Sequence, residues 1–320
     1  CFAAGKIVLA AALLVWLVRS GHLALSAWAE IRWTVGAVAV VAGQIGLIAA
    51  GMFLLGLRLR MLLDAAGVAL GRRRAFGLTA VGSFVGSVLP GVVGGNAVKA
   101  VVLGQVDAPR ERTRVMVAVV FDRVIGVFSL ILLGALAAVA ALAAGSLAVP
   151  LRVLLVAPIA GIGLLILLVA CYGIARRIRP DDPPPLHIPA RLWLPLAVAA
   201  SYAGSPGLLA RCVTLSVVNH ALVCNSYLVA AALLGGVPVG VLEQFLLNPL
   251  AMAMNILPFT PGGVGLAETA FSYLYEVVGV QGGAAFGLLG RIILYAAYTL
   301  VGVPCLVRLP RAHRSLSLIH

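Results

Sequence analysis

The chain has 320 residues, of which 62% are hydrophobic, 36 are glycine and only 10% are charged. This composition excludes a water-soluble globular protein, whose apolar share is much lower. The formal net charge of +13 comes from lysines and arginines that lie in short clusters between long apolar runs. Such clusters are typical of loops that face anionic lipid and the cytoplasm. We therefore predict an all-α, polytopic helical membrane protein with no nucleic-acid partner.

The sequence offers no pattern that indicates catalysis, a metal or a cofactor. The five cysteines form no CxxC pair, and the five histidines lack metal-ligand spacing. Nucleophile elbows, HExxH, P-loops and GxGxxG turns are missing. The longest hydrophilic stretch, 176–191, is too short for a soluble catalytic or ATPase domain. We expect a protein that is not an enzyme and uses no cofactor.

In chain order, the apolar run 7–18 predicts a short first helix, and 33–56 predicts the second. A basic loop follows, which we place in the cytoplasm, with Arg58, Arg60, Arg72, Arg73 and Arg74. The glycine-rich segment 75–105 comes next and is again followed by arginines. Because both flanks are basic, we predict a re-entrant hairpin that breaks at Pro90 and Gly91. Such a break must be buried in protein or line a wet cavity.

Long helices are predicted at 115–144 and 152–175, followed by a basic, proline-rich linker at 176–191. Segment 192–204 is predicted to be interfacial, and 206–234 crosses the membrane. The remaining segments are a second broken region, 241–278, and a last helix, 284–307, which places the C-terminus in the cytoplasm. This topology puts 16 of the 23 basic residues inside and only three outside, as the positive-inside rule requires.

We read the whole chain, 1–320, as a single transmembrane domain in four parts. These are the first helix with an external loop (1–32), a first repeat (33–144, hairpin 75–105), a connecting helix with the cytoplasmic linker (145–200), and a second repeat (201–320, hairpin 241–280).

An internal repeat is visible when the sequence is aligned with itself at an offset of 168 residues. Segment 89–95 then falls on 257–263, both reading L-P-x-x-x-G-G, and Arg123 falls on Arg291 and Gly134 on Gly302. The predicted hairpin breaks are Pro90, Gly91, Gly94, Gly95, Pro258, Pro261, Gly262 and Gly263. Since the hairpins enter from opposite sides, the halves form inverted-topology repeats, an architecture typical of alternating-access transporters. The other reading is that proline and glycine kink ordinary membrane helices.

Ionisable groups inside a membrane are functional candidates by default. The candidate substrate-binding residues follow the two breaks: Asn96, Lys99, Asp122, Arg123, Glu268 and Arg291. The three cations suit an anionic head group, and the half-helix N-termini add N–H donors. Asp122 and Glu268 would act as counter-charges. Alternatively, these residues form structural ion pairs without substrate contact.

Three segments together resemble the transmembrane region of the lysylphosphatidylglycerol synthase and flippase family: 87–100, Asp122-Arg123, and 257–268. The resemblance covers nearly the whole chain. It implies a multi-pass protein of the bacterial inner membrane, with no cofactor, that translocates a phospholipid. The best-known members move aminoacylated phosphatidylglycerol outward and so counter cationic antimicrobial peptides. Their cytoplasmic aminoacyl transferase domain has no counterpart in this chain, so we expect no lipid synthesis.

Two positions depart from the family pattern. Asn96 stands where the family often has Asp, which removes a titratable group, and Lys99 stands where it often has Arg, which keeps the charge but loses the fork geometry. The expected partner is a membrane phospholipid. The sequence leaves open whether a separate lipid-modifying enzyme also binds and whether the protein forms a homo-oligomer. The alternative function is a non-transporting subunit that presents polyprenyl- or hopanoid-type lipid precursors to a partner enzyme.

Overall fold

The computed structural model describes residues 2–23, 26–88, 93–103, 109–145, 149–175, 190–236, 239–256 and 259–308. Every regular element within these ranges is a helix, which confirms the predicted all-α class. The helices long and apolar enough to cross a bilayer are α3 (Val35–Ala65), α6 (Pro109–Ala143), α9 (Pro206–Leu233) and α12 (Gly283–Arg308). The chain is therefore a multi-pass helical membrane protein.

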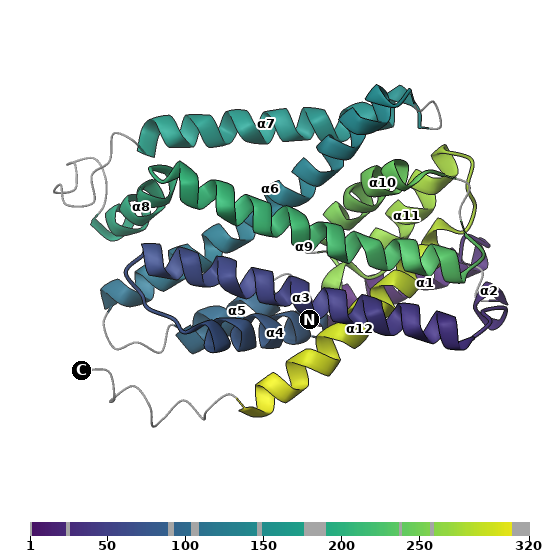
Figure 1. The fold of residues 1–320 in the computed structure, drawn as a ribbon, viewed down its shortest axis with the longest axis horizontal. Helices are drawn as coiled ribbons and strands as arrows, with labels where there is room; N and C mark the ends of the chain where they lie inside the picture. Colours follow the sequence, from purple (N-terminus) through teal and green to yellow (C-terminus); the bar gives the residue numbers. More distant parts are fainter. Residues whose placement is uncertain are drawn as a thin grey trace.

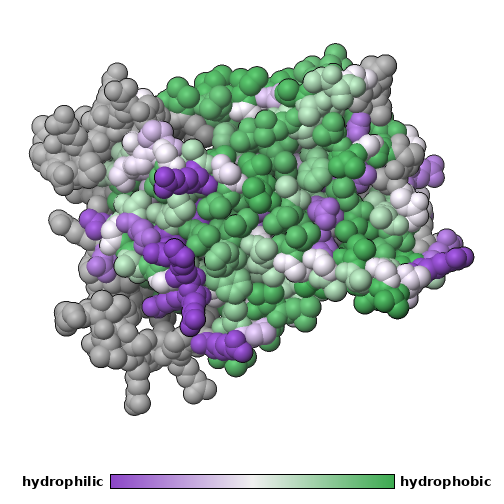
Figure 2. Space-filling model, viewed as in Figure 1, coloured by the Kyte–Doolittle hydropathy of each residue, from purple (hydrophilic) through white to green (hydrophobic). Residues whose placement is uncertain are grey.

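The outer helices are α1 (Phe2–Arg19), the short α2 (Ser26–Ala29), α7 (Leu151–Ala175) and α8 (Ala190–Ala203). Helix α7 packs against α6 and α8 and leaves Leu155, Ile159 and Ile166 exposed. Figure 2 shows a broad hydrophobic surface between the two ends of the molecule. Such a surface fits a chain whose sides face lipid tails.

Helices α3 and α9 cross at the centre and run antiparallel. Gln44 donates to the carbonyl of Leu222 over 2.8 Å and accepts from Asn225 over 2.6 Å, whereas Arg58, further along α3, contacts Ser216, earlier on α9. These polar contacts fix the register of the two helices, since an apolar interface alone would tolerate sliding.

The shorter helices form two pairs, α4 (Arg72–Val88) with α5 (Val93–Leu103) and α10 (Val241–Ala253) with α11 (Leu266–Val277). The 3-10 turns η1 (Met254–Ile256) and η2 (Pro261–Gly263) lie between α10 and α11. At 1.5 Å per residue, α5, α10 and α11 are each about 16–20 Å long, short of the roughly 30 Å of hydrocarbon. Figure 1 shows the first pair in the left half of the molecule and the second in the right half. The predicted breaks at Pro90, Gly91 and Pro258 lie outside the described residues.

The shift of 168 residues carries α3 onto α9, α4 onto α10 and α6 onto α12, within a few residues at the ends. Packing follows the same correspondence, because α6 packs on α10 and α12 packs on α4. A Cβ at Gly134 would lie 3.5 Å from Pro249, and one at Gly302 would lie 2.8 Å from the carbonyl oxygen of Ala80. The two matched glycines thus let each long helix approach a short helix of the other half.

Several predicted helix boundaries were wrong. Helix α1 begins at Phe2 rather than at 7, and residues 72–74 form the first turn of α4 rather than part of the basic loop. Helix α3 continues to Ala65 instead of ending near Gly56, so Arg58 and Arg60 lie in the helix rather than in a cytoplasmic loop. The run from 57 to 63 contains only leucine, arginine and methionine, all good helix formers, and the first glycine after it is Gly67. Arg58 is buried, because a carboxylate from another helix neutralises it.

Helix α6 begins at Pro109 rather than at 115. Pro109 suits the first helical position, and Glu111 in the first turn complements the helix dipole. Asp122 consequently lies about 20 Å from the helix start along the axis, rather than two turns from it.

We predict that Gly302→Ala lowers the unfolding midpoint in detergent, although alanine favours helix more than glycine does. Its methyl group would press on the backbone of α4, and overpacking of this kind costs about 1–3 kcal/mol. The matched control is Gly46→Ala on α3, which has nothing within 4 Å of the new methyl group and should leave the midpoint unchanged or raised. Equal midpoints for the two variants would contradict the close α4–α12 contact.

Candidate binding site

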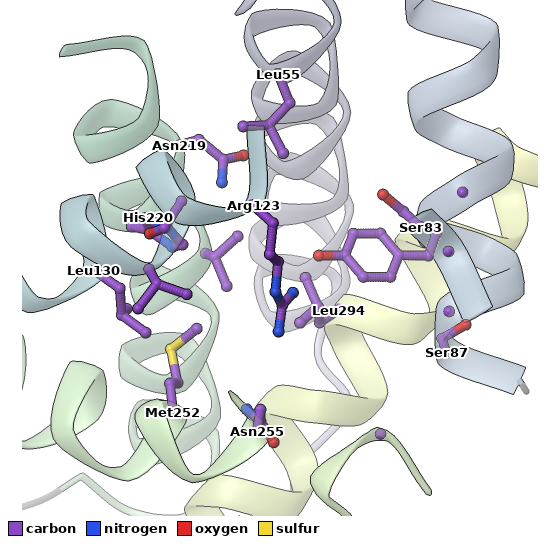
Figure 3. Close-up of a pocket in the computed structure, with 18 of the residues that line it drawn as sticks. Leu55, Ser83, Ser87, Arg123, Leu130, Asn219, His220, Met252, Asn255 and Leu294 are labelled. Atoms are coloured by element: carbon purple, nitrogen blue, oxygen red, sulfur yellow. The ribbon is translucent and has the colours of Figure 1, made fainter. Parts of the chain in front are cut away.

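A cavity of about 310 Å³ lies between the two halves and is called the central cavity below. Its walls come from α3, α4, α5, α6, α9, α10, η1, η2 and α12 (Figure 3). Its polar and charged lining consists of Arg58, Ser83, Ser87, Lys99, Asp122, Arg123, Asn219, His220, Tyr227, Asn255, Arg291, Tyr295 and Tyr298. Helices that are far apart in sequence therefore contribute to one polar space inside an apolar bundle.

Asp122 forms the first ion-pair cluster of the cavity. Its carboxylate accepts from Arg58 Nε over 2.7 Å and from Lys99 Nζ over 3.1 Å. All three residues are buried, with exposed fractions of 2% for Asp122, 4% for Arg58 and 7% for Lys99. Arg58 also donates to Ser216, whose hydroxyl donates to the carbonyl of Cys212. One carboxylate thus serves two cations, which leaves one positive charge unbalanced in this cluster.

Glycines bring Lys99 to this position. The backbone of α5 approaches α4 so closely that a Cβ at Gly95 would overlap the carbonyl of Gly82. Lys99 follows Gly95 by one turn, and its side chain also passes Gly82. Small residues at this helix–helix contact therefore allow the ammonium to reach Asp122.

Arg291 and Glu268 form the second cluster. Arg291 Nε lies 2.5 Å from Glu268 Oε1, and Glu268 Oε2 accepts the backbone N–H of Gly265 over 2.7 Å. The two terminal nitrogens of Arg291 donate to the carbonyl of Gly262, the hydroxyl of Tyr295 and the amide oxygen of Asn255. Four of the five N–H donors of Arg291 thus bind protein partners, and these bonds hold η1 and η2 against α12.

The turn that presents the Gly262 carbonyl requires glycine. Gly262 and Gly263 have φ values of 58° and 74°, which side chains with a Cβ rarely adopt. A Cβ at Gly263 would also collide with Asn255. The G-G of the sequence motif therefore shapes the backbone that Arg291 binds.

Arg123 differs from its repeat equivalent Arg291. Within the described ranges its guanidinium makes neither a hydrogen bond nor an ion pair. Figure 3 shows its guanidinium at the centre of the cavity, between the α9 side chains and Asn255. Because a guanidinium carries five N–H donors, Arg123 is the group in the cavity with the most unused donor capacity.

The α9 wall adds neutral polar groups. His220 Nε2 lies 2.9 Å from the carbonyl oxygen of Gly126, which only accepts, so this nitrogen carries the proton. Its Nδ1 is a buried acceptor that has no hydrogen-bond partner among the described residues. The cavity therefore offers both cationic donors and a neutral acceptor.

The structure brings Lys99, Asp122, Arg123 and Arg291 to one cavity. Glu268 lies behind Arg291 and is fully buried, and the side chain of Asn96 lies outside the described residues. Gly94 and Gly95 begin α5, and Pro261, Gly262 and Gly263 make up η2. Sequence reasoning missed Arg58, although the unbroken helix-forming run around it could have indicated that it belongs to α3.

The formal charges favour an anion. Arg58, Lys99, Arg123 and Arg291 face two carboxylates, Asp122 and Glu268, so the described residues of the site carry two excess positive charges. Excess charge is costly inside an apolar bundle unless water or a ligand compensates it. A phosphate or carboxylate group in the cavity would provide that compensation, and Arg123 could bind it through two parallel N–H donors.

Asp122→Asn should destabilise the fold strongly, by about 3–5 kcal/mol, because it leaves two buried cations without their counter-charge. Asp64→Asn is the matched control, since Asp64 forms a half-exposed pair with Arg60 that contributes about 0–1 kcal/mol. Unfolding midpoints of the purified variants in one detergent provide the comparison. Similar midpoints for both would show that Asp122 is not a structural anchor.

The comparisons with known proteins agree with this picture. A search of curated proteins found no match. Residues 3–302 match the family described as the lysylphosphatidylglycerol synthase TM region. This match confirms the resemblance predicted from the hairpin motifs. Because it covers nearly the whole chain, the protein belongs to the lysylphosphatidylglycerol synthase transmembrane-region family.

Proposed function

We propose that this protein is a lipid flippase, which moves a phospholipid with an anionic or zwitterionic head group between leaflets by alternating access. The observation that carries the proposal is Arg123, which has no ion-pair partner in the described part of the chain and lies in a central cavity with excess positive charge. Membership of a lipid-related membrane family supports it. Aminoacylated phosphatidylglycerol is the substrate class that the resemblance suggests.

The head group would bind through its phosphate inside the cavity. Its phosphate would accept two N–H donors from Arg123, while Lys99 and Arg58 remain on Asp122 as nearby positive charge. The acyl chains would stay in the surrounding lipid, because the cavity of about 310 Å³ accommodates a head group but not two acyl chains.

Two similar halves of opposite orientation are a common architecture of alternating-access transporters. The antiparallel course of the repeat-equivalent helices α3 and α9 supports inverted topology. The short helix pairs in opposite halves of the molecule support two re-entrant hairpins, one from each membrane face (Figure 1). Rocking of one half against the other would then expose the cavity to each leaflet in turn.

The orientation follows from the basic residues. Arginines cluster where α3 ends, where α4 and α6 begin and where α12 ends, and the positive-inside rule assigns these ends to the cytoplasm. The proposed location is the bacterial inner membrane, with a cytoplasmic C-terminus and a phospholipid as the principal partner.

Vesicles that contain the purified protein and fluorescent phosphatidylglycerol test the proposal. Arg123→Ala should slow transbilayer movement at least about tenfold, because a hydrogen bond to a charged group contributes about 1.5–3 kcal/mol. Arg152→Ala, an exposed arginine at the start of α7, is the matched control and should transport normally. Equal rates for both variants, with equal unfolding midpoints, would contradict the role of Arg123.

A non-transporting subunit that presents lipid precursors to a partner enzyme is the second candidate. The four hydrogen bonds of Arg291, which hold the turns between α10 and α11 in place, favour this second candidate. A rigid turn suits static binding of a lipid. Single cysteines at Ser87 and Asn255, which both line the cavity, are introduced into a variant without the five native cysteines. Their labelling with an impermeant reagent distinguishes the two candidates. Labelling from one side only, with and without lipid substrate, favours the static subunit, and a substrate-dependent change of side favours the flippase.

A further inference from the structure

A second cavity, of about 660 Å³, lies on the outside of the α3–α9 pair and is called the outer groove below. Its lining comes from the end of α3, the first residue of α4 and the beginning of α9: Leu57, Arg60, Met61, Asp64, Arg72, Ala210, Arg211, Thr214 and Leu215. Figure 2 shows hydrophilic residues gathered over this end of the molecule, beside the hydrophobic surface. The proposed transport path does not use any of these side chains.

The outer groove and the central cavity lie on different faces of the same two helices. Arg58 points inward to Asp122, whereas Arg60, two residues on, is turned about 200° around the helix axis. On α9, Ser216 faces Arg58, whereas Thr214 and Leu215 face the groove. The groove is therefore a separate site and not an extension of the cavity.

The groove carries excess positive charge. Three arginines line it, against the single carboxylate of Asp64, which pairs with Arg60 at 3.2 Å. Arg72 and Arg211 make no ion pair within the part of the chain that the structure describes. Two guanidinium groups from different halves of the chain are thus available for an anion with several oxygens.

The faces that form the groove continue as apolar surface toward the middle of both helices. One turn before Leu57 on α3 lies Phe53, which is 44% exposed, and one turn after Thr214 on α9 lies Val218, which is 42% exposed. Because α3 and α9 are antiparallel, both residues lie on the same side of the groove. A ligand that fits has an anionic end and an apolar end, as a membrane phospholipid does.

We propose that the outer groove binds an anionic phospholipid of the surrounding leaflet, which is held as a bound lipid and is not transported. Its phosphate lies between Arg60 and Arg72 of the first half and Arg211 of the second. Its acyl chains lie along Phe53 and Val218. The lipid bridges the two halves where they cross, so its occupancy stabilises one relative position of α3 and α9.

The test uses phosphatidylglycerol with a photoreactive group near its glycerol backbone, added to the full-length protein in phosphatidylcholine vesicles. Mass spectrometry of the digested protein should find adducts on the α3 and α9 segments that contain Leu57, Met61 and Leu215. Unlabelled phosphatidylglycerol should compete, and phosphatidylcholine should not. Arg60→Gln with Arg211→Gln should lower these adducts about tenfold, since each basic residue near a membrane surface contributes substantially to binding of anionic lipid.

Controls separate the groove from folding and from the central cavity. Arg211→Gln alone changes one exposed residue and should still lower the adducts severalfold in a normally folded protein. Arg308→Gln, an exposed arginine at the end of α12, should leave them unchanged, and so should Arg123→Ala. Adducts that persist in the double variant would overturn the proposal. Equal competition by phosphatidylcholine would overturn it too, and competition by millimolar glycerol 3-phosphate would show a site for soluble phosphate instead.

Discussion

The fold depends on pairing charged side chains inside the helix bundle, where neither water nor lipid neutralises them. Asp122 is central to this pairing, because it serves two buried cations. Its two oxygens hold Arg58 of α3 and Lys99 of α5 against α6. Helix α5 is too short to span a bilayer, so the ion pair supplies part of the anchoring that length would otherwise provide. The same contact that fixes α5 also brings positive charge into the central cavity, so one carboxylate couples the stability of the fold to the charge of the cavity.

The two halves share a backbone plan but differ in charge, and the difference explains why one arginine is unpaired. Arg291 meets Glu268, which stands near the beginning of α11. The shift of 168 residues places Ala100 at the position that corresponds to Glu268, so Arg123 has no equivalent carboxylate. Its neighbour Asp122 already serves two other cations. Within the residues that the structure describes, Ala100 therefore accounts for the absence of a carboxylate that would pair with Arg123 as Glu268 pairs with Arg291.

Features set by local composition could be predicted from the sequence, and those set by distant contacts could not. Hydropathy and flanking residues placed α9 within one residue of its observed ends. The repeat register located Arg123 and Arg291 in the cavity. Arg58 was assigned to a loop, because the positive-inside rule treats an arginine at the end of an apolar run as interfacial. Its partner is 64 residues away, and only the packing of α3 on α6 reveals the pair.

The α3–α9 crossing links the central cavity to the outer groove. Arg58 and Ser216 line the inner side of this crossing, and Arg60 and Arg211 line the outer side. At its centre a Cβ on Gly51 would collide with Asn219, so the helices touch at a point where neither can shift without disturbing the other. Any rocking of the halves must change this crossing angle. A lipid in the outer groove would then favour one crossing angle. The lipid composition of the leaflet would in this way influence from which leaflet the central cavity can be reached.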